Sequence, residues 1–360
     1  MPGLFETALL APLQRVLYFW GPSRKPEMDE LVKKSIATVE QRKKTAVPWT
    51  PDEPYDQPYY RFENGKWEAT TSKIEHANPA GTLKPSDKLA LYTWNIDFML
   101  PHPNSRMRAA LHHLETLCTA QPPNTHPVIF LQECLATDLT LLASSPWIQA
   151  NFHLTDLTPA SWASSHYGTT TLLSNRLSAS ASFRIHYSNS RMQRDVLVLD
   201  LPLSTTTKPL RLCNTHLESL PAFPPLRPQQ LALCAQHMHN PALHASVLAG
   251  DLNAIQSFDQ HLPSANGLKD AYLELGGSED DAEAGHTWGQ QASTVLRERF
   301  GTSRMDKVLF CGGVVCEGFE RFGGGVEVED QREREEIVGL GFGKGWITDH
   351  LGVKAVFGLG

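Results

Sequence analysis

The chain has 360 residues, of which 41% are apolar and 20% charged, and such a composition is typical of a globular protein with a sizeable core. Its formal net charge of −7 argues against a general attraction to polyanions, so any contact with nucleic acid must come from a local basic site or from a metal ion. Six cysteines without a Cys-x-x-Cys pair favour reduced thiols inside the cell over a disulfide framework or a zinc site. No apolar run reaches about 18–20 residues, so we expect neither a membrane span nor secretion.

Residues 1–87 differ from the rest of the chain in their residue pattern and are expected to form an N-terminal extension. Apolar residues on helical spacing predict a helix near residues 9–17, and a mixed-charge pattern predicts another over residues 27–44. Four prolines and six aromatic residues within residues 48–67 predict a loop. Because a free linker would not expose so many rings, we expect this segment to pack on the main domain.

From residue 88 onward, strands and helices alternate, which predicts a main domain over residues 88–357. Helices are expected at residues 105–118 and 228–239. Strands are expected at residues 89–96, 127–132, 168–173, 183–187, 195–201, 210–214, 246–250, 307–311 and 351–357. Many strands with few helices favour two packed mixed sheets with helices outside over a doubly wound parallel sheet. Residues 323–345, rich in glycine and charge, are predicted to form a mobile loop.

The stretch 246–253 is typical of a buried strand that stops at Gly250 and then presents an acid and an amide, Asp251 and Asn253. Because side chains alternate along an extended backbone, these two point the same way. An ionised carboxylate beside a neutral amide suits oxygen chemistry on phosphate. A polar turn after a core strand is the other interpretation, and residues elsewhere in the chain must decide between the two.

Polar residues recur where other apolar strands end. Each alone has an ordinary explanation: Glu133 could be a solvated strand end, and an Asp-His pair is usually part of a loop. As a set they combine carboxylates, amides and histidines without cysteine, a mixture that suits Mg²⁺ or Mn²⁺ better than zinc and thereby points to phosphate chemistry. The residues are Asn95, Glu133, Thr215 with His216, Asp251 with Asn253, Asp306, and Asp349 with His350.

Six motifs, in their order along residues 88–357, resemble the endonuclease/exonuclease/phosphatase superfamily. This resemblance implies a DNase I-like α/β fold, a four-layer sandwich of two packed mixed sheets flanked by helices, with residues 88–357 as the catalytic domain. Two positions depart from the family pattern, namely Thr348 in place of serine and Cys134 in place of an aliphatic residue. The motifs are Trp94-Asn95-Ile96-Asp97, Leu131-Gln132-Glu133, Thr215-His216-Leu217-Glu218-Ser219, Gly250-Asp251-Leu252-Asn253, Arg304-Met305-Asp306-Lys307 and Thr348-Asp349-His350-Leu351-Gly352-Val353.

The resemblance also implies a metal site and a base. Glu133 is expected to be the principal Mg²⁺ ligand, with Mn²⁺ as a possible substitute, and Asn95 and Asp349 would complete the shell directly or through water. Asp251 would activate or position the attacking water. Asn253 would hold Asp251 and the nucleophile in line.

Two histidines would complete the catalytic set that the resemblance implies. His216 would donate a hydrogen bond to a non-bridging phosphate oxygen. His350, oriented by Asp306, would stabilise the charge that builds up on the phosphorus centre. Loss of any one such group typically lowers the rate by about two to four orders of magnitude.

Within the superfamily, three features most resemble the tyrosyl-DNA phosphodiesterase 2 subfamily: the run 216–219, the run 191–194 and residues 286–288. The implied substrates are DNA 5′ ends with a covalently attached tyrosine or peptide. The resemblance implies a monomer that acts in the nucleus, with the cytoplasm as an additional location. The ubiquitin-binding module of the animal enzymes has no recognisable counterpart in residues 1–87. Expected substrate contacts are Tyr167, Arg194, Trp288 and Ser219. The alternatives are a structural tyrosine, a solvated arginine and a core tryptophan.

Two other hypotheses stay open at this point. Another member of the superfamily, such as an abasic-site endonuclease, an RNA-end nuclease, or a phosphoinositide or sphingolipid hydrolase, would share nearly the same core. A non-catalytic scaffold with this fold would normally show gaps in the metal and base set, and none is visible in the sequence.

Overall fold

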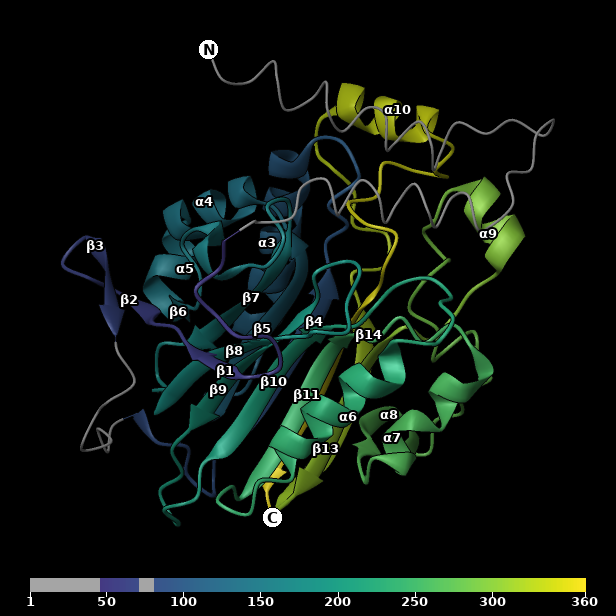
Figure 1. Ribbon diagram of the computed structural model, residues 1–360. Helices are drawn as coiled ribbons and strands as arrows, with labels where there is room; N and C mark the ends of the chain where they lie inside the picture. Colours follow the sequence, from purple (N-terminus) through teal and green to yellow (C-terminus); the bar gives the residue numbers. More distant parts are fainter. Residues whose placement is uncertain (1–45, 71–80) are drawn as a thin grey trace.

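The computed structural model describes residues 46–70 and 81–360. Two β-sheets pack face to face, with helices on the outer side of each, so the expected α/β sandwich of two mixed sheets is confirmed (Figure 1). The helices predicted within residues 1–45 lie outside the described residues. Among the described residues, no helix is long and apolar enough to cross a membrane.

The first sheet has eight strands, and the neighbouring strands β4 and β5 within it run parallel. Side chains of β4 alternate between two apolar clusters: Leu89 and Leu91 face the layer between the sheets, whereas Tyr92 and Trp94 face the outer helices. A strand buried on both faces reads as a continuous apolar run, which made β4 easy to predict. In spatial order the strands are β14 (Val314–Phe322), β15 (Gly352–Leu359), β4 (Lys88–Asn95), β5 (Thr125–Cys134), β7 (Gly168–Ser174), β6 (Phe152–Leu154), β2 (Tyr59–Glu63) and β3 (Lys66–Thr70).

The second sheet has seven strands, and it contains a parallel pair of its own, β10 with β11. Val247 and Leu212 of this pair pack into the layer between the sheets, while Leu248 and Cys213 face the outer helices. In spatial order the strands are β1 (Pro54–Asp56), β8 (Ala181–His186), β9 (Asp195–Leu201), β10 (Leu210–His216), β11 (Ala245–Asp251), β13 (Asp306–Gly312) and β12 (Lys269–Asp270).

Helices cover the outer faces of both sheets (Figure 1). Met107 and Leu114 of α3 pack with Trp94 on the eight-stranded sheet, and Leu231 of α6 packs with Val196 on the seven-stranded sheet. The helices are α3 (Pro103–Thr119), α4 (Ala136–Ser144), α5 (Pro146–Asn151), α6 (Arg227–Met238), α7 (Leu262–Ala265), α8 (Ala271–Glu274), α9 (Thr294–Phe300) and α10 (Gln331–Gly339), with 3-10 turns at Pro159–Ser161 and Ser257–Gln260.

The aromatic segment after residue 46, predicted as a loop, contains three short strands. β1 pairs antiparallel with β8, and β2 with β3 forms a hairpin that joins the other sheet through β6. The ring of Trp49 stacks on His186 with a centroid distance of 3.9 Å, and Gln57 donates a hydrogen bond to the carbonyl of Thr155 at 3.1 Å. The proline spacing hid β1 because it is an edge strand, where proline is tolerated, and it begins at Pro54. The division of the chain at residue 88 stays a prediction.

The glycine- and charge-rich segment 323–345 was predicted as a mobile loop, and this prediction is wrong. It contains helix α10, whose N-terminus is capped by Asp330, the side chain of which accepts a hydrogen bond from the backbone N–H of Glu333 at 3.0 Å. The helix buries only Ile337 completely, so its sequence carries little apolar periodicity.

Candidate active site

Asp251 is the last residue of β11, and the two neighbouring strands carry polar residues at the same position in the sheet register. In the sheet register it lies opposite His216 at the end of β10 and opposite Asp306 at the start of β13. Gly250 before it is required by close packing, because a Cβ at this position would lie 1.7 Å from the carbonyl oxygen of Thr215. The strand pairing therefore brings three predicted site residues together at one edge of the sheet.

Asp251 is 2% exposed, and both oxygens of its carboxylate have polar partners. Its Oδ2 accepts a hydrogen bond from Nδ2 of Asn95 at 3.0 Å and lies 3.2 Å from Nε2 of His216. Its Oδ1 accepts from the backbone N–H of Asn253 at 2.8 Å. The side chain of Asn253 donates instead to the carbonyl of Leu217 at 3.1 Å, so Asn253 holds Asp251 through its backbone.

Burial alone would raise the pKa of the Asp251 carboxyl. The imidazoles of His350 and His216, together with the hydrogen bonds from His216 and Asn253, outweigh that effect and hold the pKa well below its usual range. Asp251 is therefore ionised at neutral pH, as a proton acceptor must be.

His216 is held in one tautomer by Arg194. The Nη1 of Arg194 donates to Nδ1 of His216, and because an arginine only donates, that ring nitrogen must be the acceptor. The ring proton then resides on Nε2, which lies 3.2 Å from Oδ2 of Asp251 and 3.8 Å from Oε1 of Glu133. Arg194 is 5% exposed, so it is not the solvated surface arginine of the alternative interpretation.

His350 connects two carboxylates. Its Nδ1 lies 2.8 Å from Oδ2 of Asp306, and its Nε2 lies 3.8 Å from Oδ2 of Asp251. Burial opposes a charge on His350, but the carboxylates of Asp306, Asp251 and Asp349 overcome this and hold its pKa well above the usual value. The imidazole is thus a cation oriented by Asp306, the arrangement that the resemblance implied.

A second cluster contains the carboxylates of Glu133, Asp349 and Asp97. Burial, followed by the negative charges of Asp349 and Glu133, raises the pKa of Asp97 to about 8. The Oδ1 of Asp97 accepts from the backbone N–H of Met99 at 2.9 Å, whereas its buried Oδ2 has no hydrogen-bond partner. Sequence reasoning missed Asp97 as a site residue, although it ends the motif that begins at Trp94; its left-handed backbone, with φ of 54°, turns it towards the site.

These residues fit a divalent cation. Asp349 and Glu133 raise the pKa of Asp97, and Glu133 also raises that of Asp349, so a cation at these hard carboxylate oxygens would supply the missing positive charge and a partner for the buried Oδ2 of Asp97. Ligand atoms of Asp251, Asp306 and His350 also lie within 4.8 Å of one another. There, however, the imidazole already spans the two carboxylates. Ligation of a cation by Glu133 and Asp349 stays a prediction.

Asn95 ends β4 and is 1% exposed. Its amide nitrogen contacts Asp251, while its Oδ1 accepts from the backbone N–H of Asp97 at 2.9 Å. It thereby links the base to the carboxylate cluster. Direct ligation of the metal by Asn95 stays a prediction.

Buried hydrogen bonds tie together the loops that carry these side chains. Arg106 of α3 is 1% exposed and donates to the carbonyls of Leu100 at 2.9 Å and Ile347 at 2.8 Å, and also to those of Ile96 and Pro101. The hydroxyl of Thr348 donates to the carbonyl of Asn95 at 2.8 Å, so threonine supplies the hydroxyl that serine supplies in the family. One arginine and one hydroxyl thus fix the loop of Asp97 against that of Asp349.

Of the four predicted substrate contacts, three are buried, namely Arg194, described above, Tyr167 and Trp288. Tyr167 is 5% exposed and donates its hydroxyl proton to the carbonyl of Met192 at 2.8 Å. Trp288 is 9% exposed and donates its indole N–H to Oδ2 of Asp349 at 2.7 Å. Ser219 is half-exposed in the loop after β10. Contact of these residues with substrate stays a prediction.

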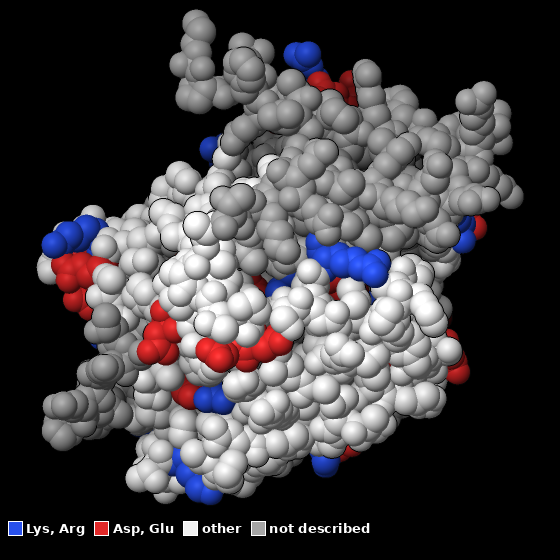
Figure 2. Space-filling view, viewed as in Figure 1, with Lys and Arg blue, Asp and Glu red and all other residues white. Residues whose placement is uncertain are grey.

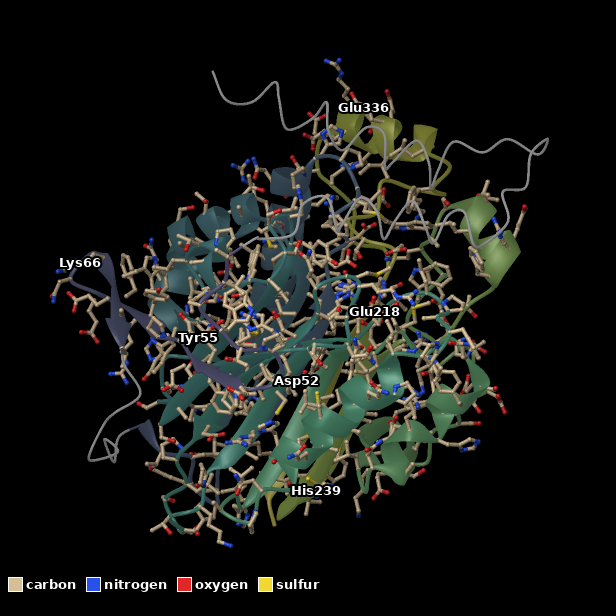
Figure 3. The ribbon with its side chains drawn as sticks, in the orientation of Figure 1. Asp52, Tyr55, Lys66, Glu218, His239 and Glu336 are labelled. Atoms are coloured by element: carbon tan, nitrogen blue, oxygen red, sulfur yellow. The ribbon has the colours of Figure 1, made fainter. Side chains whose placement is uncertain are left out.

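Glu218, next to Ser219, has a structural role that sequence reasoning did not assign. It lies near the middle of the face shown in Figure 3. Its buried carboxylate accepts hydrogen bonds from the hydroxyl of Ser190 at 2.8 Å and from the backbone N–H groups of Arg191 at 3.0 Å and Met192 at 3.1 Å. The motif His-Leu-Glu-Ser therefore anchors the loop that leads to Arg194.

The fold and the site together define a phosphoester hydrolase that uses a divalent metal. A family model described as the Endonuclease/Exonuclease/phosphatase family matches residues 92–350, and the chain belongs to this family. Cys134, where the family has an aliphatic residue, is fully buried in the outer core of the eight-stranded sheet and packs like one.

Solved structures share the fold with this chain at low identity. Truncated TDP2 from Caenorhabditis elegans is 23% identical, with a TM-score of 0.55, over 75% of this chain and 97% of that one. D. rerio TDP2 complexed with a single-strand DNA product is 19% identical, with a TM-score of 0.55, over 75% and 98%. The human Nocturnin catalytic domain with bound sulfate is 15% identical, with a TM-score of 0.52, over 78% and 96%. No curated protein sequence matches the chain.

Proposed function

We propose that this protein is a 5′-tyrosyl-DNA phosphodiesterase, which hydrolyses the bond between a DNA 5′ phosphate and the tyrosine of a trapped protein or peptide. The observation that carries the hydrolytic part is the placement of the ionised Asp251 between His216 and His350, with the carboxylate of Glu133 near His216 and that of Asp349 near His350. The tyrosyl-DNA part rests on the motif resemblance. Support comes from TDP2 structures, one of them with a single-strand DNA product.

In the proposed reaction, water attacks phosphorus and the bond from phosphorus to the tyrosine oxygen breaks. The products are a DNA 5′ phosphate and a free phenol. The pKa of a phenol is about 10, far below the value of about 15.7 for water. The phenol oxygen can therefore leave with little need for a proton donor.

The side chains have distinct tasks in this proposal. Asp251 accepts the proton of the attacking water, and Asn95 and Asn253 hold its carboxylate in place. His216 presents its Nε2 proton, and the cationic His350 offsets the negative charge that develops on the phosphoryl oxygens. A divalent cation held by Glu133, Asp97 and Asp349 would polarise a phosphoryl oxygen. Mg²⁺ is the proposed ion because all three ligands are carboxylates.

Charge on the protein surface agrees with a locally bound DNA end rather than with a long duplex track. Figure 2 shows Lys and Arg side chains in small separate groups among acidic ones on the visible part of one face. A protein that tracks along a duplex usually carries a broad basic face. We therefore propose binding of a single-stranded 5′ end near the site. Action as a monomer in the nucleus is proposed from the motif resemblance alone.

The test measures release of a 5′ phosphate from an oligonucleotide with a 5′-phosphotyrosine, in Mg²⁺ and in EDTA. We expect Mg²⁺-dependent cleavage that Asp251→Asn and Glu133→Gln each lower by about 10²–10⁴-fold. Glu63→Gln, an exposed carboxylate on β2, is the control and should keep full activity.

Parallel assays use abasic DNA, poly(A) and inositol phosphates. Cleavage of one of these with no cleavage of the phosphotyrosyl substrate would replace the DNA-repair proposal with another hydrolase of the family. Wild-type turnover by Glu133→Gln in Mg²⁺ would overturn the metal assignment. Inactivity on every phosphodiester would favour a non-catalytic scaffold.

A further inference from the structure

Phe98 directly follows Asp97 and stacks on Tyr167. Their ring centroids lie 4.3 Å apart with an angle of 26° between the planes. The guanidinium of Arg194 also packs over Tyr167, 5.1 Å from the ring centroid. Tyr167 and Arg194 are buried, whereas Phe98 is only half-buried, so Phe98 is the solvent-accessible member of this stack.

The backbone of Phe98 is tied to the carboxylate cluster. Its N–H donates to Oε2 of Glu133 at 3.0 Å, and the next N–H, of Met99, donates to Asp97. The ring thus lies on the short loop that carries Asp97, and the backbone of this loop is hydrogen-bonded to Glu133. Stacking and these hydrogen bonds already order the ring of Phe98. Binding of a ligand to it therefore costs the protein little additional conformational entropy.

We propose that the accessible face of Phe98 is a binding subsite for a planar aromatic ring carried next to the scissile phosphate. Two groups of a tyrosyl-DNA end have this chemistry, the phenyl ring of the tyrosine and the base of the 5′-terminal nucleotide. The inference rests on the proposed function, because that function places such a ring beside the carboxylate cluster. An aromatic ring that stacks on a base also tolerates any base sequence, as an enzyme acting on arbitrary DNA ends requires.

The test is a binding cycle in the catalytically inactive Asp251→Asn background, in Mg²⁺, with fluorescence anisotropy as the readout. The protein carries Phe98, Phe98→Leu or Phe98→Trp. Each is titrated with a 5′-phosphotyrosyl oligonucleotide, the same oligonucleotide with a butyl ester in place of tyrosine, and versions of both with an abasic 5′-terminal nucleotide. Leucine keeps apolar bulk without a ring, and tryptophan keeps the ring.

We expect Phe98→Leu to weaken binding by about 5- to 150-fold for ligands that carry the stacked ring and to have no effect once that ring is removed. Phe98→Trp should restore affinity. Dependence on tyrosine identifies the leaving group as the stacked ring, and dependence on the base identifies the terminal nucleotide. Equal weakening of all four ligands, or no weakening of any, overturns the proposal.

The outcome is separable from that of the proposed function. If the wild-type protein cleaves the phosphotyrosyl substrate, but Phe98→Leu weakens the binding of ligands with and without the ring equally, only the Phe98 subsite is contradicted. No cleavage of this substrate, with ring-dependent binding of a 5′-phosphorylated product strand, would contradict the tyrosyl-DNA function and keep the subsite. The Mg²⁺ concentration for half-maximal activity should be unchanged in Phe98→Leu, because the N–H that holds Glu133 belongs to the backbone.

Discussion

Asp306 and His350, 44 positions apart in the sequence, form a buried pair in which Nδ1 of the imidazole lies 2.8 Å from Oδ2 of the carboxylate. The register of β11 and β13 places Asp306 opposite Asp251, so His350 contacts both acids. The orientation of the imidazole is thus set by a residue of a neighbouring strand, while Asp306, Asp251 and Asp349 together favour its positive charge.

Replacement of Asp306 by asparagine should lower kcat by about 10²–10⁴-fold, because an amide neither stabilises the imidazolium nor fixes its ring orientation. KM should change far less. Steady-state kinetics in Mg²⁺ measures both constants, and a thermal melt checks that the variant is folded. A variant with wild-type kcat would show that the pair is only structural.

Stability should depend on pH through His350. Its pKa in the folded protein lies well above the value of about 6.5 expected when unfolded, so the folded state binds an extra proton between these two pKa values. The contribution is complete below the unfolded pKa and is lost as pH rises towards the folded pKa. In EDTA, the free energy of unfolding of wild type should therefore fall relative to His350→Gln, by up to about 1.4 kcal/mol per pH unit above pH ~6.5.

Urea denaturation of both proteins at several pH values checks this. A constant difference between them over pH 6.5 to 8.5 would contradict a raised pKa.

Metal binding should release a proton from Asp97. In the metal-free protein its pKa of about 8 keeps this carboxyl largely protonated at pH 7, and a cation displaces the proton. Calorimetric titration with Mg²⁺ in two buffers of different ionisation enthalpy should report close to one proton for wild type and about none for Asp97→Asn. Equal proton release by the two proteins would exclude Asp97 from the metal site.

Trp288→Phe should raise the Mg²⁺ concentration needed for half-maximal activity by about 10- to 100-fold, because phenylalanine lacks the N–H that orients Asp349. The substitution keeps an aromatic ring, so a role in base stacking would survive it. Activity measured over a range of Mg²⁺ concentrations separates the two roles. An unchanged Mg²⁺ requirement, with a loss of activity in Trp288→Leu only, would favour stacking.

Arg106→Met should both destabilise the protein and weaken metal binding. It removes the donor to several buried carbonyls, and an unsatisfied buried acceptor typically costs about 1–3 kcal/mol. It also releases the loop of Asp97 from that of Asp349. Urea unfolding and Mg²⁺ titration measure the two effects.

Arg176→Met is the matched control, because Arg176 also donates to backbone carbonyls, those of Pro123 and Thr125. Arg176 is exposed, and neither of these two partners belongs to the site. It should lower stability less and leave the Mg²⁺ requirement unchanged. Equal effects of the two variants on Mg²⁺ would mean that Arg106 has no specific role at the site.

Several features of the protein are determined by its sequence alone. Apolar runs buried on both faces mark β4, β5, β10 and β11, and the polar residue that ends each run is one of Asn95, Glu133, His216 and Asp251. These signals are local, because a run of apolar residues and the polar residue after it lie within a few positions of each other. The same local signal is weak for α10, which buries one side chain completely, and for the proline-bearing edge strand β1.

Only the tertiary structure decides which polar groups meet. Arg194 and His216 lie 22 residues apart, Asn95 and Asp251 lie 156 apart, and Thr348 reaches the carbonyl of Asn95 across 253 residues. The raised pKa of Asp97, the tautomer of His216 and the stack of Phe98 on Tyr167 all depend on such contacts. Burial and electrostatic coupling act through space, and the packing of the two sheets sets distances that no local pattern in the chain contains.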